Sequence, residues 1–183
     1  MPDYTITELN IERKNLTQLP DDIHLYTKLD TLFCDINQIT QLDNLPLGLK
    51  ELDCGCNKIT QLDNLPIGLE KLNCNVNKIN QLDNLPYGLE ILYCDVNKIT
   101  QLDNLPRNLE ILSCSCNKIT QLNNLPIGLK ILCCHHNNIT QLNNLPSSLN
   151  YLECYNNLLD YDFEPTLENI KKYIASNVNI PTS

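Results

Sequence analysis

The residues of this chain best suited to chemistry are its cysteines and histidines. Cys133–His136 is a run of two thiols and two imidazoles, and Cys116 lies at the position equivalent to His136, twenty residues earlier. Thiolates and imidazoles are the ligands that zinc prefers in structural sites, and a thiol beside an imidazole can also serve as a nucleophile with its base. A metal site or a thiol-dependent reaction would therefore be centred on these residues.

The spacing of these residues argues against both kinds of site. Successive side chains of a strand point to opposite faces, so Cys134 would point away from Cys133 and His135. The run lacks the C-x-x-C or H-x-x-x-H spacing typical of zinc sites, and no repeat supplies both a base and an orienting acid. We therefore predict no catalytic residue, no cofactor and no metal. Zinc stays an open alternative at four residues: Cys116, Cys133, His135 and His136.

Most of the cysteines belong to a repeat. Seven of the ten recur every twenty residues, at Cys34, Cys54, Cys74, Cys94, Cys114, Cys134 and Cys154. Around each of them the pattern L-x-x-L-x-C-x-x-N-x-I-T-Q-L-x-N-L-P returns with few changes. Strict repetition at this length is typical of a solenoid, in which each repeat contacts only its neighbours.

The repeat indicates how its residues are placed. The alternation in Leu72, Asn73 and Cys74 predicts a short strand whose first and third side chains point inward. Free cysteine is among the most buried residue types, and equivalent side chains of a parallel ladder lie side by side at about 4.8 Å. We therefore expect packed free thiols instead of disulfides, which suits a reducing compartment.

A row of asparagines accompanies the cysteines, three residues after each of the seven. Where the chain turns out of a strand, a side-chain amide can donate to and accept from backbone groups that the ladder leaves unpaired. We interpret this row as structural. It consists of Asn37, Asn57, Asn77, Asn97, Asn117, Asn137 and Asn157.

One domain, 1–183, is expected from the uniform composition. Its first segment, 1–28, is an irregular repeat, because the step from Ile6 to Leu29 is 23 residues instead of twenty. Regular repeats span 29–160, without a linker between them.

The last segment, 161–183, is a predicted cap. Leu167, Ile170 and Ile174 follow Pro165 at the spacing of one helical face, which indicates a short helix that covers the last repeat. We expect the end of the chain, 177–183, to fray.

Composition disfavours several classes of function. A net charge of −9 argues against nucleic-acid binding, which needs clustered Lys and Arg. The first residues show neither a basic segment nor an apolar run, so no signal peptide is visible, and no stretch is long enough to span a membrane. We predict an intracellular protein that binds neither nucleic acid nor membranes.

The repeat resembles the leucine-rich repeat family over nearly the whole chain. Residues at that family's spacing in one repeat are Leu69, Leu72, Cys74, Asn77 and Ile79. The segment Leu65–Leu69, with Leu-Pro before a variable pair, is similar to the LPX-type repeats of bacterial secreted effectors. This resemblance implies an α/β-type leucine-rich repeat solenoid, mostly β, with a parallel sheet on its concave face. It also implies extended or 3-10 convex segments and a short C-terminal capping helix.

A narrower resemblance is to the leucine-rich repeat proteins of giant DNA viruses of the mimivirus type. It is carried by the inward cysteine, the abundance of Asn, Ile and Lys, and the ending Tyr161–Ile170. The family implies a module that binds other proteins on the concave sheet. With a viral origin, the protein would act in the host cytoplasm on a host protein.

Differences between the repeats point to the same face. Three outward positions of each strand region vary, while T-Q-L-x-N-L-P on the opposite side barely changes. In one of the variable rows Ile91, Ile111 and Ile131 are adjacent aliphatic residues, which we expect to be exposed and to mark an interface. The predicted partner-binding residues are Phe33, Glu51, Asp53, Ile91, Tyr93, Ile111, Ile131, His135, Tyr151 and Tyr155.

Three functions agree with this sequence. The leading one is a noncatalytic protein–protein interaction module that grips an unknown partner protein on its concave sheet. The second is a self-associating structural protein that buries the isoleucine row in a homodimer. The third is the substrate-recognition part of an effector, which is disfavoured because too little chain follows the repeats for a ligase domain.

Overall fold

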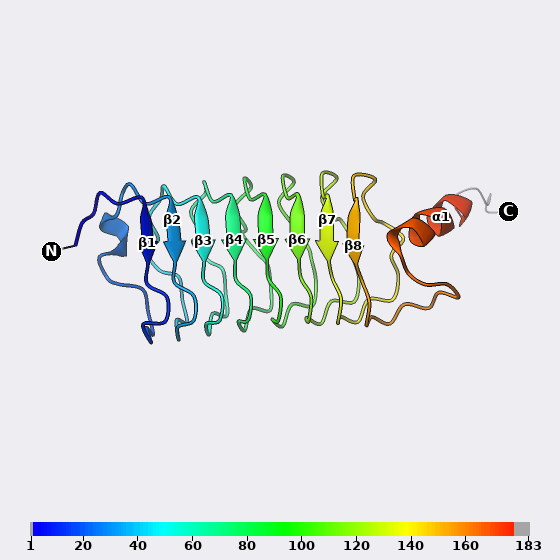
Figure 1. Ribbon diagram of the computed structural model, residues 1–183, viewed down its shortest axis with the longest axis horizontal. Coiled ribbons are helices and arrows are strands. Elements are labelled where there is room, and N and C mark those ends of the chain that lie inside the picture. Colours follow the sequence, from blue (N-terminus) through cyan, green and yellow to red (C-terminus); the bar gives the residue numbers. More distant parts are fainter. Residues whose placement is uncertain (1, 178–183) are drawn as a thin grey trace.

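A computed structural model describes residues 2–177 of the chain. It is a solenoid built on one eight-stranded parallel sheet whose strands lie in chain order (Figure 1). The strands are β1 (Glu8–Asn10), β2 (Thr31–Phe33), β3 (Glu51–Asp53), β4 (Lys71–Asn73), β5 (Ile91–Tyr93), β6 (Ile111–Ser113), β7 (Ile131–Cys133) and β8 (Tyr151–Glu153). After each strand the chain passes behind the sheet and returns beside that strand, so the predicted mostly-β solenoid is confirmed.

The twenty-residue period sets the register of the sheet. From β2 to β8 each strand residue pairs with the residue twenty positions later, as Leu92 pairs with Leu112. From β2 to β7 the central leucine is buried and its two neighbours are half-buried. Side chains from the return segments, such as Ile99 and Leu102, fill the space behind the sheet. The core is therefore a stack of equivalent side chains that runs along the whole solenoid.

Replacing Leu92 by Ala should lower the free energy of unfolding by about 2 to 5 kcal/mol, because deletion of a fully buried leucine side chain leaves a cavity. Replacing Gln101 by Ala should change it by less than about 0.5 kcal/mol, because that side chain is exposed on the return segment. Urea denaturation of both variants measures the difference. Equal losses would show that the inward and outward faces are assigned wrongly.

The asparagine row has the structural role that the sequence predicts. In the repeat of β5 the side-chain amide of Asn97 donates to the carbonyl oxygens of Cys74, Cys94 and Asp95 at 3.1–3.2 Å. Its Oδ1 atom accepts from the backbone N–H of Ile79 at 3.0 Å. One side chain thus satisfies backbone groups of two successive repeats at the turn where the strand ladder stops.

The inward cysteines are packing residues. All ten cysteines of the chain are free thiols in the structure, as predicted, and the seven of the repeat are buried. Several of these thiols also donate to the backbone of the next strand, as Cys94 Sγ does to the carbonyl oxygen of Ser113 at 3.3 Å. A small side chain with a weak donor therefore suits this position, where the sheet surface meets the core.

The first repeat is longer than the others, as expected. Leu9 pairs with Leu32, an offset of 23 residues, and the connection contains the 3-10 helix η1 (Ile23–Leu25). The ring of Tyr4 packs edge-on against buried Tyr26, with the ring centroids 4.9 Å apart. This packing helps to close the N-terminal end of the core.

The predicted capping helix is α1 (Leu167–Asn177), which lies beyond β8 at the end of the solenoid (Figure 1). Ile170 on this helix is fully buried, and Leu167 and Ile174 pack against the core. Upstream of the helix, the carbonyl oxygen of Pro165 accepts from Cys154 Sγ at 3.2 Å. Residues 178–183, most of the segment that we expect to fray, lie outside the described part of the chain.

Candidate interaction surface

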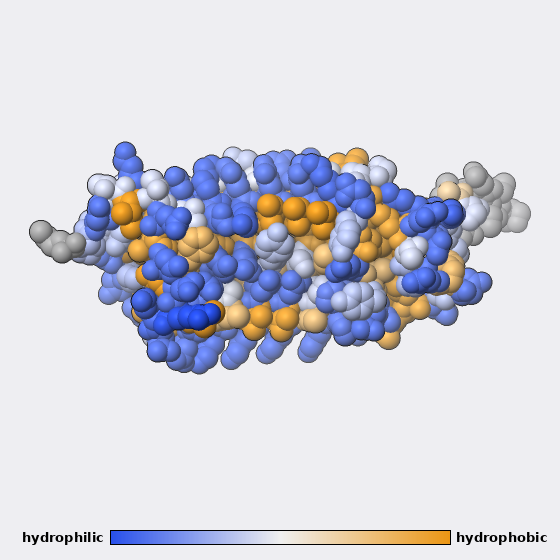
Figure 2. All heavy atoms as spheres, viewed as in Figure 1, coloured by the Kyte–Doolittle hydropathy of each residue, from blue (hydrophilic) through white to orange (hydrophobic). Residues whose placement is uncertain are grey.

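The isoleucine row lies on the outward face of the sheet. Ile91, Ile111 and Ile131 open β5, β6 and β7 and pair directly with one another. Figure 2 looks onto this face and shows an apolar band across the upper part of these strands. All three side chains are half-buried, so they are less exposed than the sequence predicts. The reason is their strand spacing of about 4.8 Å, at which each isoleucine covers part of the next.

Aromatic side chains border this row toward the C-terminal end. Tyr93 is half-buried on β5, whereas Tyr151 and Tyr155 are 47% and 52% exposed. His135 stacks on Tyr155 with ring centroids 4.4 Å apart and planes 6° apart. The ring of His136 meets Tyr155 edge-on at 5.6 Å. The structure therefore joins His135, His136 and Tyr155 into one aromatic group at the end of the sheet.

The N-terminal part of the face is less acidic than its sequence suggests. Glu51 forms an ion pair with Lys71 on the next strand. Asp53 accepts hydrogen bonds from the side-chain amide of Asn73 at 2.9 Å and from the backbone N–H of Gly55 at 3.0 Å. Phe33 lies half-buried beside them on β2. These carboxylates are thus already engaged within the sheet.

The cysteine and histidine run does not form a reactive thiol. Burial, followed by the nearby carboxylate of Glu153, raises the pKa of Cys133 to about 11. Cys133 therefore stays protonated at neutral pH, and the thiol is a much weaker nucleophile than the thiolate. The Nδ1 atom of His135 is buried without a hydrogen-bond partner. Within residues 2–177 no group of three or more His, Cys, Asp and Glu side chains is placed to hold a metal ion.

Sequence reasoning missed two further apolar rows, which lie in the turns. One row precedes the repeated asparagines and includes Ile36, Val76 and Val96, which are 41–47% exposed. The other follows the repeated Leu-Pro pairs and consists of Leu47, Ile67, Tyr87 and Ile127, which are 68–88% exposed. The sequence signal that could have revealed these rows is an apolar residue directly before the repeated Asn or directly after the repeated Leu-Pro pair.

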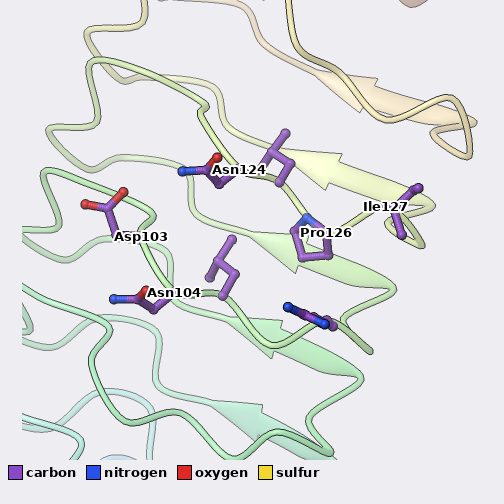
Figure 3. Close-up of a pocket in the computed structure, with 8 residues that line it drawn as sticks. Asp103, Asn104, Asn124, Pro126 and Ile127 are labelled. Carbon is purple, nitrogen blue, oxygen red and sulfur yellow. The ribbon is translucent and has the colours of Figure 1, made fainter.

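An open hollow lies between two successive turns on the second of these rows (Figure 3). Asp103 and Ile127 lie at its opposite ends, with Asn104, Asn124 and Pro126 between them. Arg107 also lines it, in the turn before β6. The hollow is a gap between repeats that is open to solvent, and it brings charged and apolar positions of the turns onto one surface.

Three comparisons place this geometry among known proteins. No protein-family profile matches the chain, and no curated protein sequence matches it. Among solved structures it is similar to YopM, a leucine-rich effector protein from Yersinia pestis, at 30% identity and a TM-score of 0.81, over 90% of this chain and 47% of that one. It is also similar to the functional domain of InlJ from Listeria monocytogenes, which includes a cysteine ladder. That match has 34% identity and a TM-score of 0.64, over 84% of this chain and 40% of that one.

A third similar structure is internalin C2 from Listeria monocytogenes, at 24% identity and a TM-score of 0.83, over 90% of this chain and 77% of that one. The chain spans less than half of the YopM and InlJ structures. All three are bacterial proteins, so the resemblance to giant-virus proteins stays a prediction. The solenoid of short turns, the parallel sheet and the terminal helix together give this chain the leucine-rich repeat fold.

Proposed function

We propose that this chain is a noncatalytic module that binds a partner protein on the outward face of its sheet, centred on Ile111. The observation that carries the proposal is the row of three isoleucines paired in register on adjacent strands, beside exposed tyrosines. Protein interfaces are enriched in aromatic residues and have apolar cores. Similarity to proteins described as an effector and as internalins supports an interaction role.

A noncatalytic role agrees with the chemistry of the face. Its thiol, Cys133, has a raised pKa, and its carboxylates Glu51 and Asp53 are held by neighbouring strands. The net charge of −9 supports a protein partner over a nucleic acid. No helix in residues 2–177 has the length and apolar content needed to cross a membrane. Three further parts of this proposal rest on the sequence alone. They are the single domain 1–183, the intracellular location and the viral origin with a host protein as partner.

Replacing Ile111 by Glu should weaken partner binding about thirtyfold or more, because truncation of a central interface anchor costs about 2 kcal/mol or more and a carboxylate adds desolvation. Affinity capture from cytosol, followed by titration of the captured protein, measures this loss. The matched control is Ile127→Glu, the same substitution at a side chain that is 84% exposed and lies in a turn outside the sheet. Circular dichroism confirms that both variants fold.

Normal binding by Ile111→Glu together with lost binding by Ile127→Glu would place the interface on the turns and refute the proposal. The second candidate function is a homodimer that buries the same isoleucine row. Sedimentation of the purified chain distinguishes the two, because only the homodimer forms without a partner and dissociates in Ile111→Glu.

A further inference from the structure

One edge of the solenoid carries a row of positive charge that contrasts with the acidic chain. The row consists of Lys58, Lys78, Lys98 and Lys118, all exposed, in the turns that follow β3–β6. The backbone N–H of each lysine donates to a carbonyl oxygen of the preceding repeat, as that of Lys98 does to Ile79 at 2.8 Å. The four lysines therefore lie on successive turns. Within residues 2–177 none of them forms an ion pair, although Lys58 Nζ donates to Gln38. Four like charges at about 4.8 Å intervals repel one another unless an anionic partner faces them.

The return segments carry a row of negative charge with the same period. It consists of Asp43, Asp63, Asp83 and Asp103, which are exposed. Asp63 and Asp83 line one hollow between repeats, and Asp83 and Asp103 line the next, so the carboxylates lie on successive turns. No hydrogen bond or ion pair engages these four carboxylates within the described residues.

Each charged row has an apolar row beside it. Two residues before the four lysines the turns hold Cys56, Val76, Val96 and Cys116, and Ile36 continues this row one repeat earlier, before Gln38. Figure 2 shows this apolar row across the turns below β3–β6, with hydrophilic atoms projecting beneath it. Four residues after the first three aspartates come Leu47, Ile67 and Tyr87, whereas Arg107 follows Asp103 at the same spacing. Ile127 holds the equivalent position in the next repeat. Asp103 and Ile127 line the same hollow, so the acidic and apolar rows share one surface (Figure 3).

The apolar row beside the lysines has an unfavourable backbone conformation. Ile36, Val76 and Val96 have φ angles of 52°, 55° and 55°, in the left-handed region that favours Gly or Asn. The chain places Asn156 at the equivalent position of a later repeat, with φ 53°. The exposed part of these side chains, 41–47%, gains no packing within the fold to offset this strain, which points to a contact outside it.

We propose that the lysine edge of one molecule binds the aspartate edge of a second copy of this chain. The two edges have opposite charge, the same number of charged residues and the same repeat spacing, so ion pairs can form in register along both rows. A partner whose charges repeat at a different spacing could form ion pairs with only part of either row. The neighbouring apolar rows would be covered by the same contact. Because the two edges differ, the contact is heterologous and can continue from copy to copy into side-by-side assemblies.

Two variants test this contact with substitutions that the chain already uses. The lysine-edge variant changes all four lysines to Asn, the residue at the equivalent position 138. The aspartate-edge variant changes all four aspartates to Asn, the residue at positions 123 and 143. Sedimentation velocity at about 0.02 M salt should show concentration-dependent association of the native chain that is lost near 1 M salt, where charges are screened. Each variant alone should associate about tenfold or more weakly.

A mixture of the two variants gives the decisive result, because each retains the edge that the other lacks. We expect a one-to-one complex that does not grow further. A native chain that is monomeric at every concentration, or variants that associate like the native chain, would overturn the proposal. Loss of association only in the lysine-edge variant would also overturn it, because the lysines would then bind a different acidic surface of the chain. Dissociation by Ile111→Glu instead would assign the contact to the sheet face.

Discussion

Raising the pH from about 8 to about 10 should lower the free energy of unfolding by on the order of 10 kcal/mol, which is comparable to the whole stability of a typical domain. Burial raises the pKa of the inward thiols, to about 12 at Cys34 and to about 11 at Cys154. Burial also raises the pKa well above the ordinary value at the other five: Cys54, Cys74, Cys94, Cys114 and Cys134.

The sign of this effect follows from proton linkage. Well below pH 9, the ordinary thiol pKa, the folded and unfolded chains both keep these protons, so the stabilisation is fully present. Above that pH the unfolded chain loses protons that the folded chain retains, and stability falls until the folded pKa is reached. Each thiol loses about 1.4 kcal/mol of stabilisation between pH 8 and 10, so seven thiols lose roughly 10 kcal/mol over this interval.

Urea denaturation under reducing conditions at a series of pH values measures this slope. Cys94→Ala removes one buried thiol and should reduce the loss between pH 8 and 10 by about 1.4 kcal/mol. The control is Cys116→Ala, which removes an exposed thiol of the neighbouring repeat and leaves all seven buried thiols in place. A native chain whose stability is the same at pH 8 and pH 10 would show that the thiols are not buried as the structure places them.

Replacing Asn97 by Asp should lower the free energy of unfolding by roughly 2 to 5 kcal/mol, although the two side chains have the same shape. The amide nitrogen of Asn97 donates to three backbone carbonyl oxygens, and a carboxylate oxygen in its place can donate to none. Each of these oxygens keeps one other donor, namely the amide of Asn77, the amide of Asn117 or the N–H of Val76. The cost is therefore that of three lost hydrogen bonds, at about 0.5 to 1.5 kcal/mol each. Repulsion between the carboxylate and the three carbonyl oxygens adds to this cost. The bond from the N–H of Ile79 can survive, so the loss isolates the donor function of the amide.

The control for this substitution is Asn80→Asp in the return segment of the preceding repeat, where the side chain is exposed. That change should stay within about 0.5 kcal/mol of the native chain. Chemical denaturation at pH 7 compares the two variants. At pH 4, protonation of the new carboxyl at position 97 restores one donor, so the deficit relative to the native chain should shrink. Equal stability of the two variants would show that the asparagine row does not hold the turns.

Much of the candidate surface could be predicted because neighbours in space lie twenty residues apart in the sequence. This offset places Ile91, Ile111 and Ile131 side by side, and the strand pairs confirm it. The same offset aligns Glu51 with Lys71, but their ion pair depends on how two long side chains extend along the row. The stack of His135 on Tyr155 likewise depends on ring orientations that spacing does not specify.

By itself, the sequence determined the solenoid, its register and which side chains form the core. Because all the regular repeats share one pattern, a position that points inward in one repeat, such as that of Cys94, points inward in all of them. Only the tertiary structure decided how far the outward isoleucines are covered and that Val76 and Val96 adopt left-handed turns. It also decided how Ile170 seals the last repeat. These features depend on contacts between neighbouring turns and at the two ends of the solenoid. There the packing of the side chains and the conformation of the backbone depend on each other, so the repeat pattern alone does not specify them.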